Sequence, residues 1–177
     1  MKKGNMVLII LLIPCILVIV NYINFRTIRL ENIYENDFNY ELYKTVENYE
    51  SFKMQDVTPF IWDKIYIIRP YISKLEMEKI LGEKWTTSDT YLEYLIEKTF
   101  LGKHPLDDDS LHKLIFTKEG KVILDITINR MEIDFTRLND YVYQNDVEFF
   151  VHKEGNGKIV LDKNDYTRWL TYVKHTI

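Results

Sequence analysis

The chain has 177 residues, of which 46% are hydrophobic and 14% aromatic, and its formal net charge at pH 7 is −4. Thirteen tyrosines and nine phenylalanines against only six glycines and four prolines indicate a packed domain and exclude a disordered tail. The mild acidic excess argues against nucleic acid as a partner, because nucleic acid requires a basic patch. The single cysteine, Cys15, excludes a disulfide-dense secreted module.

The N-terminal stretch Met6 to Val20 contains neither a charged nor a strongly polar side chain. As a helix this stretch would measure about 22 Å, which is less than the roughly 30 Å of a hydrocarbon core. The amphipathic extension to Phe25 brings it to a full span. The sequence therefore predicts a membrane anchor over residues 1–25, in contact with the lipid bilayer through residues 6–25.

Three fates are open to this segment: retention, cleavage as a signal peptide, and lipidation at Cys15. The region lacks alanine and offers no pair of small residues for cleavage, and Pro14 and Ile16 do not fit a lipidation site. Retention is favoured. Lys2 and Lys3 precede the apolar run, which predicts a single-pass protein of the cell membrane with a cytoplasmic N-terminus and an extracytoplasmic body.

The next segment, residues 26–39, is expected to be a stalk, and residues 40–177 an extracytoplasmic domain. Helical spacing of apolar residues begins at Tyr40, and Ile61 to Ile68 is typical of a strand buried on both faces. Ser73 and Glu76 form a capping box that predicts a helix closed by Gly82 in a left-handed conformation. A second helix is expected from Thr90 to Leu101, capped by Ser88 or Asp89 and stopped by Gly102 and Pro105.

The later part of the chain is expected to form two hairpins. Residues 114–117 and 121–129 flank a turn at Gly120, and residues 147–152 and 158–161 flank a turn that contains Gly155 and Gly157. The two hairpins resemble each other, through duplication or through convergence on favourable turn chemistry. Helical spacing returns over residues 166–173. The sequence thus predicts an α+β domain with a mainly antiparallel sheet, built from two hairpins and an earlier strand and packed by two to four helices.

One stretch resembles a known group of proteins: Trp62-Asp63-Lys64-Ile65-Tyr66-Ile67-Ile68-Arg69-Pro70-Tyr71. It is similar to a Trp-Asp-Lys, apolar strand, Pro-Tyr signature in small bacterial envelope proteins that are membrane-anchored or lipidated, and the resemblance covers residues 58–135. It implies a fold and a location but no activity, because no activity is known for that family.

Two interpretations of this strand are open. In one, the aromatic residues belong to the core or its rim, and Asp63 and Lys64 form a surface ion pair of small energetic value. In the other, acidic, basic and aromatic side chains together form a surface that binds a protein partner. The residues concerned are Trp62, Asp63, Lys64, Arg69 and Tyr71.

Metal ligands and catalytic groups are sparse. Candidate cation ligands are His104, Asp107, Asp108, Asp109 and His112. Their spacing matches no EF-hand, and an acidic loop that caps the following segment is favoured. No cofactor is expected.

No G-x-S-x-G motif or phosphate-binding glycine loop occurs, and Glu132 and Asp134 are expected to face solvent together from a strand. The favoured hypothesis is therefore a non-catalytic, membrane-anchored domain that binds a protein or an envelope component, and one version is an immunity-type protein. The alternatives are a small-molecule or peptide sensor and an envelope hydrolase.

Overall fold

The computed structural model describes residues 3–99, 102, 105–138, 142–144, 147–155 and 157–162, and within them all side chains except those of residues 3–11, 105, 142 and 144. The chain divides into two compact units. Unit 1 comprises Met1–Glu31 and Lys84–Lys103, and unit 2 comprises Asn32–Glu83 and His104–Ile177.

Unit 1 contains two helices, α1 (Lys3–Ile28), which includes Pro14, and α5 (Tyr91–Glu97). Within the described residues, no helix combines the length and the apolar character that crossing a bilayer requires. The side chains of residues 6–11, where the predicted span begins, lie outside the described part.

Unit 2 contains two four-stranded sheets. In the first, β4 (Lys121–Asn129), β3 (Leu111–Lys118), β2 (Lys64–Ile68) and β6 (Val142–Gln144) lie in that order, all antiparallel. In the second, the order is β1 (Ser51–Lys53), β7 (Glu148–Lys153), β8 (Ile159–Asp162) and β5 (Ile133–Asp134), with β5 parallel to β8. Unit 2 also holds α2 (Glu35–Asn48), α3 (Met54–Val57), α4 (Lys74–Leu81) and the 3₁₀ turn η1 (Pro105–Asp107).

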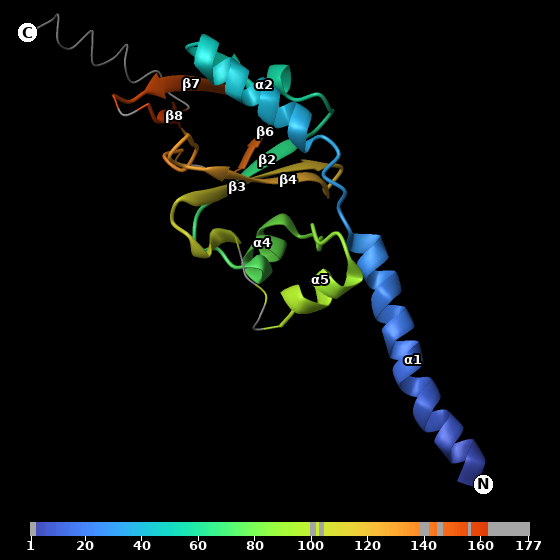
Figure 1. Cartoon of the computed structure of the whole chain (residues 1–177). Helices are drawn as coiled ribbons and strands as arrows, with labels where there is room; N and C mark the ends of the chain where they lie inside the picture. Colours follow the sequence, from blue (N-terminus) through green and yellow to red (C-terminus); the bar gives the residue numbers. More distant parts are fainter. Residues whose placement is uncertain are drawn as a thin grey trace, which may run out of the picture. The chain divides into compact units, whose positions relative to one another are not determined.

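One hydrophobic core joins both sheets and α2. The apolar stripe of α2, formed by Phe38, Leu42 and Val46, is completely buried in this core. The core also takes alternate residues of β2, β3 and β4 together with Phe149 of β7. Figure 1 shows α2 and α4 on opposite sides of the first sheet. Both faces of that sheet are therefore covered, which explains why four consecutive residues of β2 are buried.

Several local predictions are confirmed. The Ser73–Glu76 capping box is present, and Gly82 ends α4 with φ +72°. Both expected hairpins form, as β3–β4 and β7–β8. In the first, Glu119 and Gly120 have φ values of +51° and +77°, the left-handed pair that a tight two-residue hairpin loop requires.

Other expectations were wrong in part. Among the described residues, the strands form two sheets, whereas one sheet was expected. The pairing is mainly antiparallel, as predicted, with one parallel pair, and four α-helices follow α1, within the predicted two to four. The helix expected from Tyr40 begins at Glu35, because Phe38 extends its apolar stripe by one turn. The cap of α5 is Thr90, and α5 ends at Glu97 instead of Leu101. The helical spacing at residues 166–173 falls outside the described residues.

Candidate functional site

An open groove lies on the loop between α3 and β2. It has a volume of about 410 Å³ and is lined by Gln55, Thr58, Pro59, Phe60, Ile61 and Trp62. None of these described lining residues carries an ionisable side chain. The groove therefore offers apolar surface with a few hydroxyl and amide groups, which suits hydrophobic contact and not proton transfer.

The walls of this groove are fixed by aromatic packing. The Phe116 ring of β3 meets Phe60 and Trp62 edge-on, with ring centroids 5.3 and 5.2 Å apart. Trp62 Nε1 donates a hydrogen bond of 2.8 Å to Thr58 Oγ1, which satisfies the polar atom of a residue that is only 2% exposed. These contacts hold the loop in one shape, so little conformational entropy would be lost when a partner binds.

One lining residue stands out from this anchored loop. Ile61 is 74% exposed, although it lies between the half-buried Phe60 and the buried Trp62. A single exposed isoleucine is ordinary, but here a rigid aromatic support holds it beside a groove. This is the arrangement expected of a residue that contacts a partner.

The first three residues of the predicted binding strand have different surroundings. Trp62 is a core residue that also lines the groove. The Asp63 carboxylate accepts a hydrogen bond of 2.5 Å from the backbone amide of Glu119, so it supports the left-handed turn of the β3–β4 hairpin. Lys64 is exposed at the first position of β2.

The remaining two residues, Arg69 and Tyr71, lie past the other end of β2. Arg69 donates from Nη2 to the carbonyl oxygen of Leu138, 2.8 Å away. Tyr71 is 68% exposed with φ +65°, and its amide donates to the carbonyl of Leu106. At about 3.4 Å per residue the two ends of the strand are roughly 15 Å apart. The five residues thus do not form one continuous patch.

The candidate cation ligands around the acidic loop lie in different surroundings. His104 lies outside the described residues, while Asp107 to Asp109 are exposed. The amide and hydroxyl of Ser110 hold the pKa of the Asp108 carboxyl below its usual range by hydrogen bonding. His112 is buried in β3. Among the described residues, no three His, Cys, Asp or Glu side chains are grouped so as to hold a metal ion.

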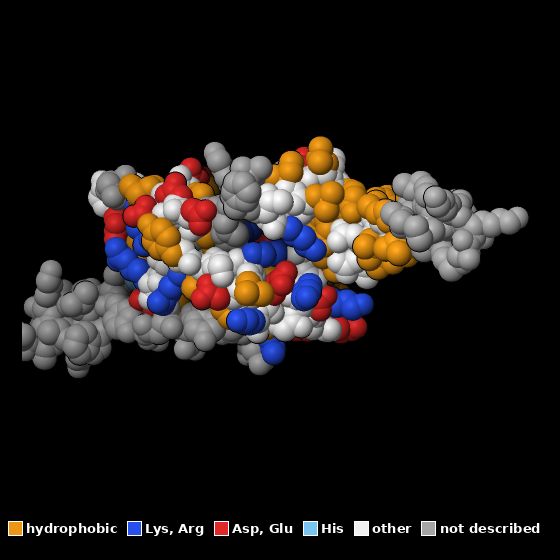
Figure 2. All heavy atoms as spheres, turned by 90° about the horizontal axis from the view of Figure 1, so that it is seen from below, with side chains coloured by type: hydrophobic (Ala, Val, Ile, Leu, Met, Phe, Trp, Pro, Cys, Tyr) orange, Lys and Arg blue, Asp and Glu red, His pale blue; other side chains and the backbone are white. Residues whose placement is uncertain are grey.

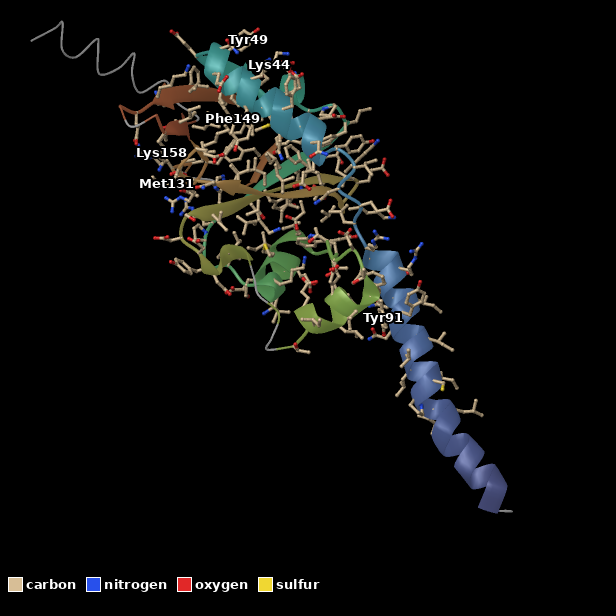
Figure 3. The ribbon with its side chains drawn as sticks, in the orientation of Figure 1. Lys44, Tyr49, Tyr91, Met131, Phe149 and Lys158 are labelled. Carbon is tan, nitrogen blue, oxygen red and sulfur yellow. The ribbon has the colours of Figure 1, made fainter. Side chains whose placement is uncertain are left out.

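A buried charge cluster surrounds Asp134 of β5, which the sequence had placed at the surface. Its side chain is only 1% exposed, and Lys158 Nζ and Arg130 Nη2 lie 2.7 and 3.4 Å from Oδ2. Thr136 donates to Oδ1 from both its amide and its hydroxyl. Burial alone raises the pKa of Asp134, but the hydrogen bonds from Lys158, Thr136 and Arg130 outweigh burial and hold that pKa well below its usual range. Figure 3 labels Lys158 near β8.

His112 lies close to this cluster and has an unusual environment. Its residue exposure is 0%, its ring lies 5.8 Å from that of Phe135, and neither ring nitrogen has a hydrogen-bond partner among the described residues. Burial lowers the pKa of His112 to about 4; the negative charge of Asp134 raises it, and the positive charges of Arg130 and Lys158 lower it. The imidazole is therefore neutral at pH 7.

A second buried ion pair lies on the other face of the first sheet. Lys113 Nζ is 2.6 Å from Asp125 Oδ1, with side-chain exposures of 7% and 1%. Asn32 donates to the carbonyl of Asp125 and accepts from its amide, at 2.7 and 3.1 Å. Asp125 faces away from the core that contains α2, but α4 covers that face of the sheet as well. The pair is a structural feature.

Comparison with known proteins gives no match: no family model, no curated protein and no solved structure matches the chain. The resemblance to small envelope proteins therefore stays a prediction. The residues of the groove and of the charge cluster must be interpreted from their own chemistry.

Proposed function

We propose that the chain is a single-pass, membrane-anchored protein whose unit 2 lies outside the cytoplasm and binds a protein partner at the groove of residues 55–62. The partner would place an apolar side chain against Ile61 and the aromatic wall behind it. An immunity-type protein that intercepts an incoming toxin at the membrane is one form of this proposal.

The membrane part of the proposal is supported by the surface of α1. From Leu12 to Ile23 its exposed hydrophobic side chains are each between 45% and 64% exposed. A contiguous apolar surface of this extent is unfavourable in water, at about 25 cal/mol per Å². Lipid would cover this surface, and Lys2 and Lys3 favour a cytoplasmic N-terminus.

The observation that carries the binding proposal is the rigid groove beside the exposed Ile61. A binding site loses affinity when its loop must become ordered as the partner binds, because ordering costs conformational entropy. The packing of Phe60 and Trp62 on Phe116 orders this loop before binding. Acid–base catalysis is poorly supported there, because none of the described lining residues is ionisable. The carboxylate of Asp134 is in turn saturated by hydrogen bonds and two cations.

A small-molecule sensor is the second candidate. The groove volume of about 410 Å³ falls in the range of ligand pockets and favours this candidate. The described lining residues offer few polar groups to orient a small ligand, namely the side chains of Gln55 and Thr58 and the indole of Trp62. The groove is also open, whereas pockets that bind small molecules bury most of the ligand.

Site-specific photo-crosslinking in cells that express the full chain tests the proposal. A photoreactive residue at Ile61 should give a discrete protein adduct, and the same residue at Leu75, an exposed leucine of α4, should not. The adduct protein, once purified, should bind the full chain and lose at least about tenfold affinity, or 1.4 kcal/mol, with Ile61→Arg. Leu75→Arg is the matched control and should bind normally. Equal crosslinking at both positions, or equal binding by both variants, would contradict the groove as the binding site.

A further inference from the structure

After Asn32–Glu83, which belong to unit 2, the chain returns to unit 1 and contacts α1. Thr86 forms a parallel bridge with Arg29; its amide donates to the carbonyl of Ile28 at 3.0 Å, and its carbonyl accepts from the amide of Leu30 at 2.8 Å. Five residues later α5 begins and contacts α1 between residues 21 and 25. The returning segment therefore runs back along α1, towards the apolar run that ends at Val20.

One face of α5 closes on α1 through two tyrosines (Figure 3 labels Tyr91). Tyr91 OH donates to Asn21 Oδ1 at 3.1 Å, and Tyr94 OH accepts from Asn24 Nδ2 at 3.0 Å. The Tyr94 ring lies 5.2 Å from Phe25, and Tyr94 and Phe25 are only 2% and 3% exposed. Asn21 and Asn24, the asparagines that follow the apolar run of α1, thus have hydrogen-bond partners on α5.

A second face of α5 is apolar and exposed. Leu92, Leu95 and Ile96, at positions i, i+3 and i+4, form one stripe and are 66%, 38% and 43% exposed. Figure 2 shows hydrophobic side chains gathered over the described part of α1, the helix on which α5 packs. The apolar stripe of α5 and the apolar surface of α1 thus both belong to unit 1.

The carboxylates of α5 are occupied by local hydrogen bonds. Glu93 accepts from the amides of Asp89 and Thr90 at the start of the helix. Glu97 Oε2 accepts from the hydroxyls of Thr86 and Ser88, at 2.7 and 2.9 Å. With these charges satisfied inside unit 1, the apolar stripe can approach a surface of low polarity without leaving a carboxylate unpartnered.

We propose that α5 is a membrane-interface helix, with Leu92, Leu95 and Ile96 inserted at the boundary between headgroups and acyl chains of the bilayer that holds α1. This inference rests on the proposed membrane anchor. At 1.5 Å per residue, residues 21–25 lie within about 8 Å of the end of the apolar run. An interfacial helix buries its apolar face by about 5–10 Å, which is the same depth. By pairing Asn21 and Asn24, α5 also extends the apolar length of a run that is short by itself.

Depth-dependent fluorescence quenching of the full chain in phosphatidylcholine vesicles tests the inference. Cys15→Ser removes the native cysteine, and single cysteines at Leu92, Ile16 and Leu75 are then labelled with an environment-sensitive fluorophore. Leu75, 62% exposed on a helix of unit 2, is the matched control for Leu92. The label at Leu92 should be blue-shifted relative to Leu75 and strongly quenched by lipids with a spin label near the headgroup. The label at Ile16 should be quenched best by spin labels deep in the acyl chain.

The label at Ile16 separates the inference from the anchor on which it rests. Quenching at Ile16 with a Leu92 label as water-exposed as Leu75 would overturn the interface helix and leave the anchor standing. No quenching at either position would overturn both. Because the stripe carries no charge, quenching at Leu92 should persist in high salt, and its loss in salt would refute apolar insertion. A label at Ile96, on the same stripe, provides a second measurement in case the substitution at Leu92 disturbs the helix. It should give the same result as that expected for Leu92.

Discussion

The loss of stability on acidification measures how strongly burial lowers the pKa of His112. The pKa of His112 is lowered from 6.5 to about 4 in the folded protein because burial disfavours the charged imidazole. The unfolded chain therefore binds a proton that the native protein does not, and stability falls as the pH drops from about 6.5 towards 4. Between pH 7 and pH 5 the free energy of unfolding should decrease by about 2 kcal/mol through this group. Asp134 contributes little in that window, because an unfolded Asp is already ionised above pH 5.

The assay is urea unfolding of the full chain in detergent, followed by tryptophan fluorescence at pH 7 and pH 5. A loss of about 2 kcal/mol corresponds to a midpoint lower by roughly 1 M urea. His112→Gln should abolish this pH dependence, while His152→Gln, a matched change on β7, should retain it. If His112→Gln and the unmodified chain lose the same stability between the two pH values, the assignment to His112 is refuted.

Three further predictions concern stability and are checked by the same unfolding assay at pH 7. Trp62→Ala should cost about 3–5 kcal/mol, because it empties a core position behind the groove; a cost below 1 kcal/mol would show that Trp62 is not core. Gly82→Val should cost about 1–2 kcal/mol through its left-handed φ alone, since a Cβ there meets nothing within 4 Å. Gly155→Val, equally open but without a positive φ, should cost less, and equal costs would refute the strain argument. Lys113→Met should cost about 3–5 kcal/mol by leaving Asp125 buried without its cation, and adding Asp125→Leu should recover most of that loss.

Local chemistry made parts of the fold predictable from the sequence. The Ser73 capping box, Gly82 and the Gly120 turn each depend on interactions within a few residues, so the sequence carried the whole signal. The strand expected over Ile61 to Ile68 is present over the shorter range Lys64–Ile68, and its burial on two faces was predictable from the unbroken apolar run. The split into two sheets was not predictable, since it depends on β1, β5 and β6, which have only two or three residues each.

The candidate site was predictable in part. The aromatic residues around Trp62 pointed to this region. The exposure of Ile61, however, depends on how the loop packs on Phe116, which is distant in sequence. Asp134 was misplaced because alternation with Glu132 suggested a solvent-facing pair. In the structure, Lys158 from 24 residues further along the chain supplies the cation that makes burial of Asp134 possible.

The discontinuous construction of unit 1 has a consequence for proteolytic shedding. Unit 1 combines Met1–Glu31 with Lys84–Lys103, and the residues between these two segments belong to unit 2. A protease that cut the connection between α1 and α2 would break the covalent link, yet Thr86 and the tyrosines of α5 would still hold α1. Release of unit 2 would therefore require α1, with its buried Phe25, to dissociate from the buried Tyr94 of α5. If α1 anchors the chain as proposed, a single nick should leave both fragments in the membrane fraction.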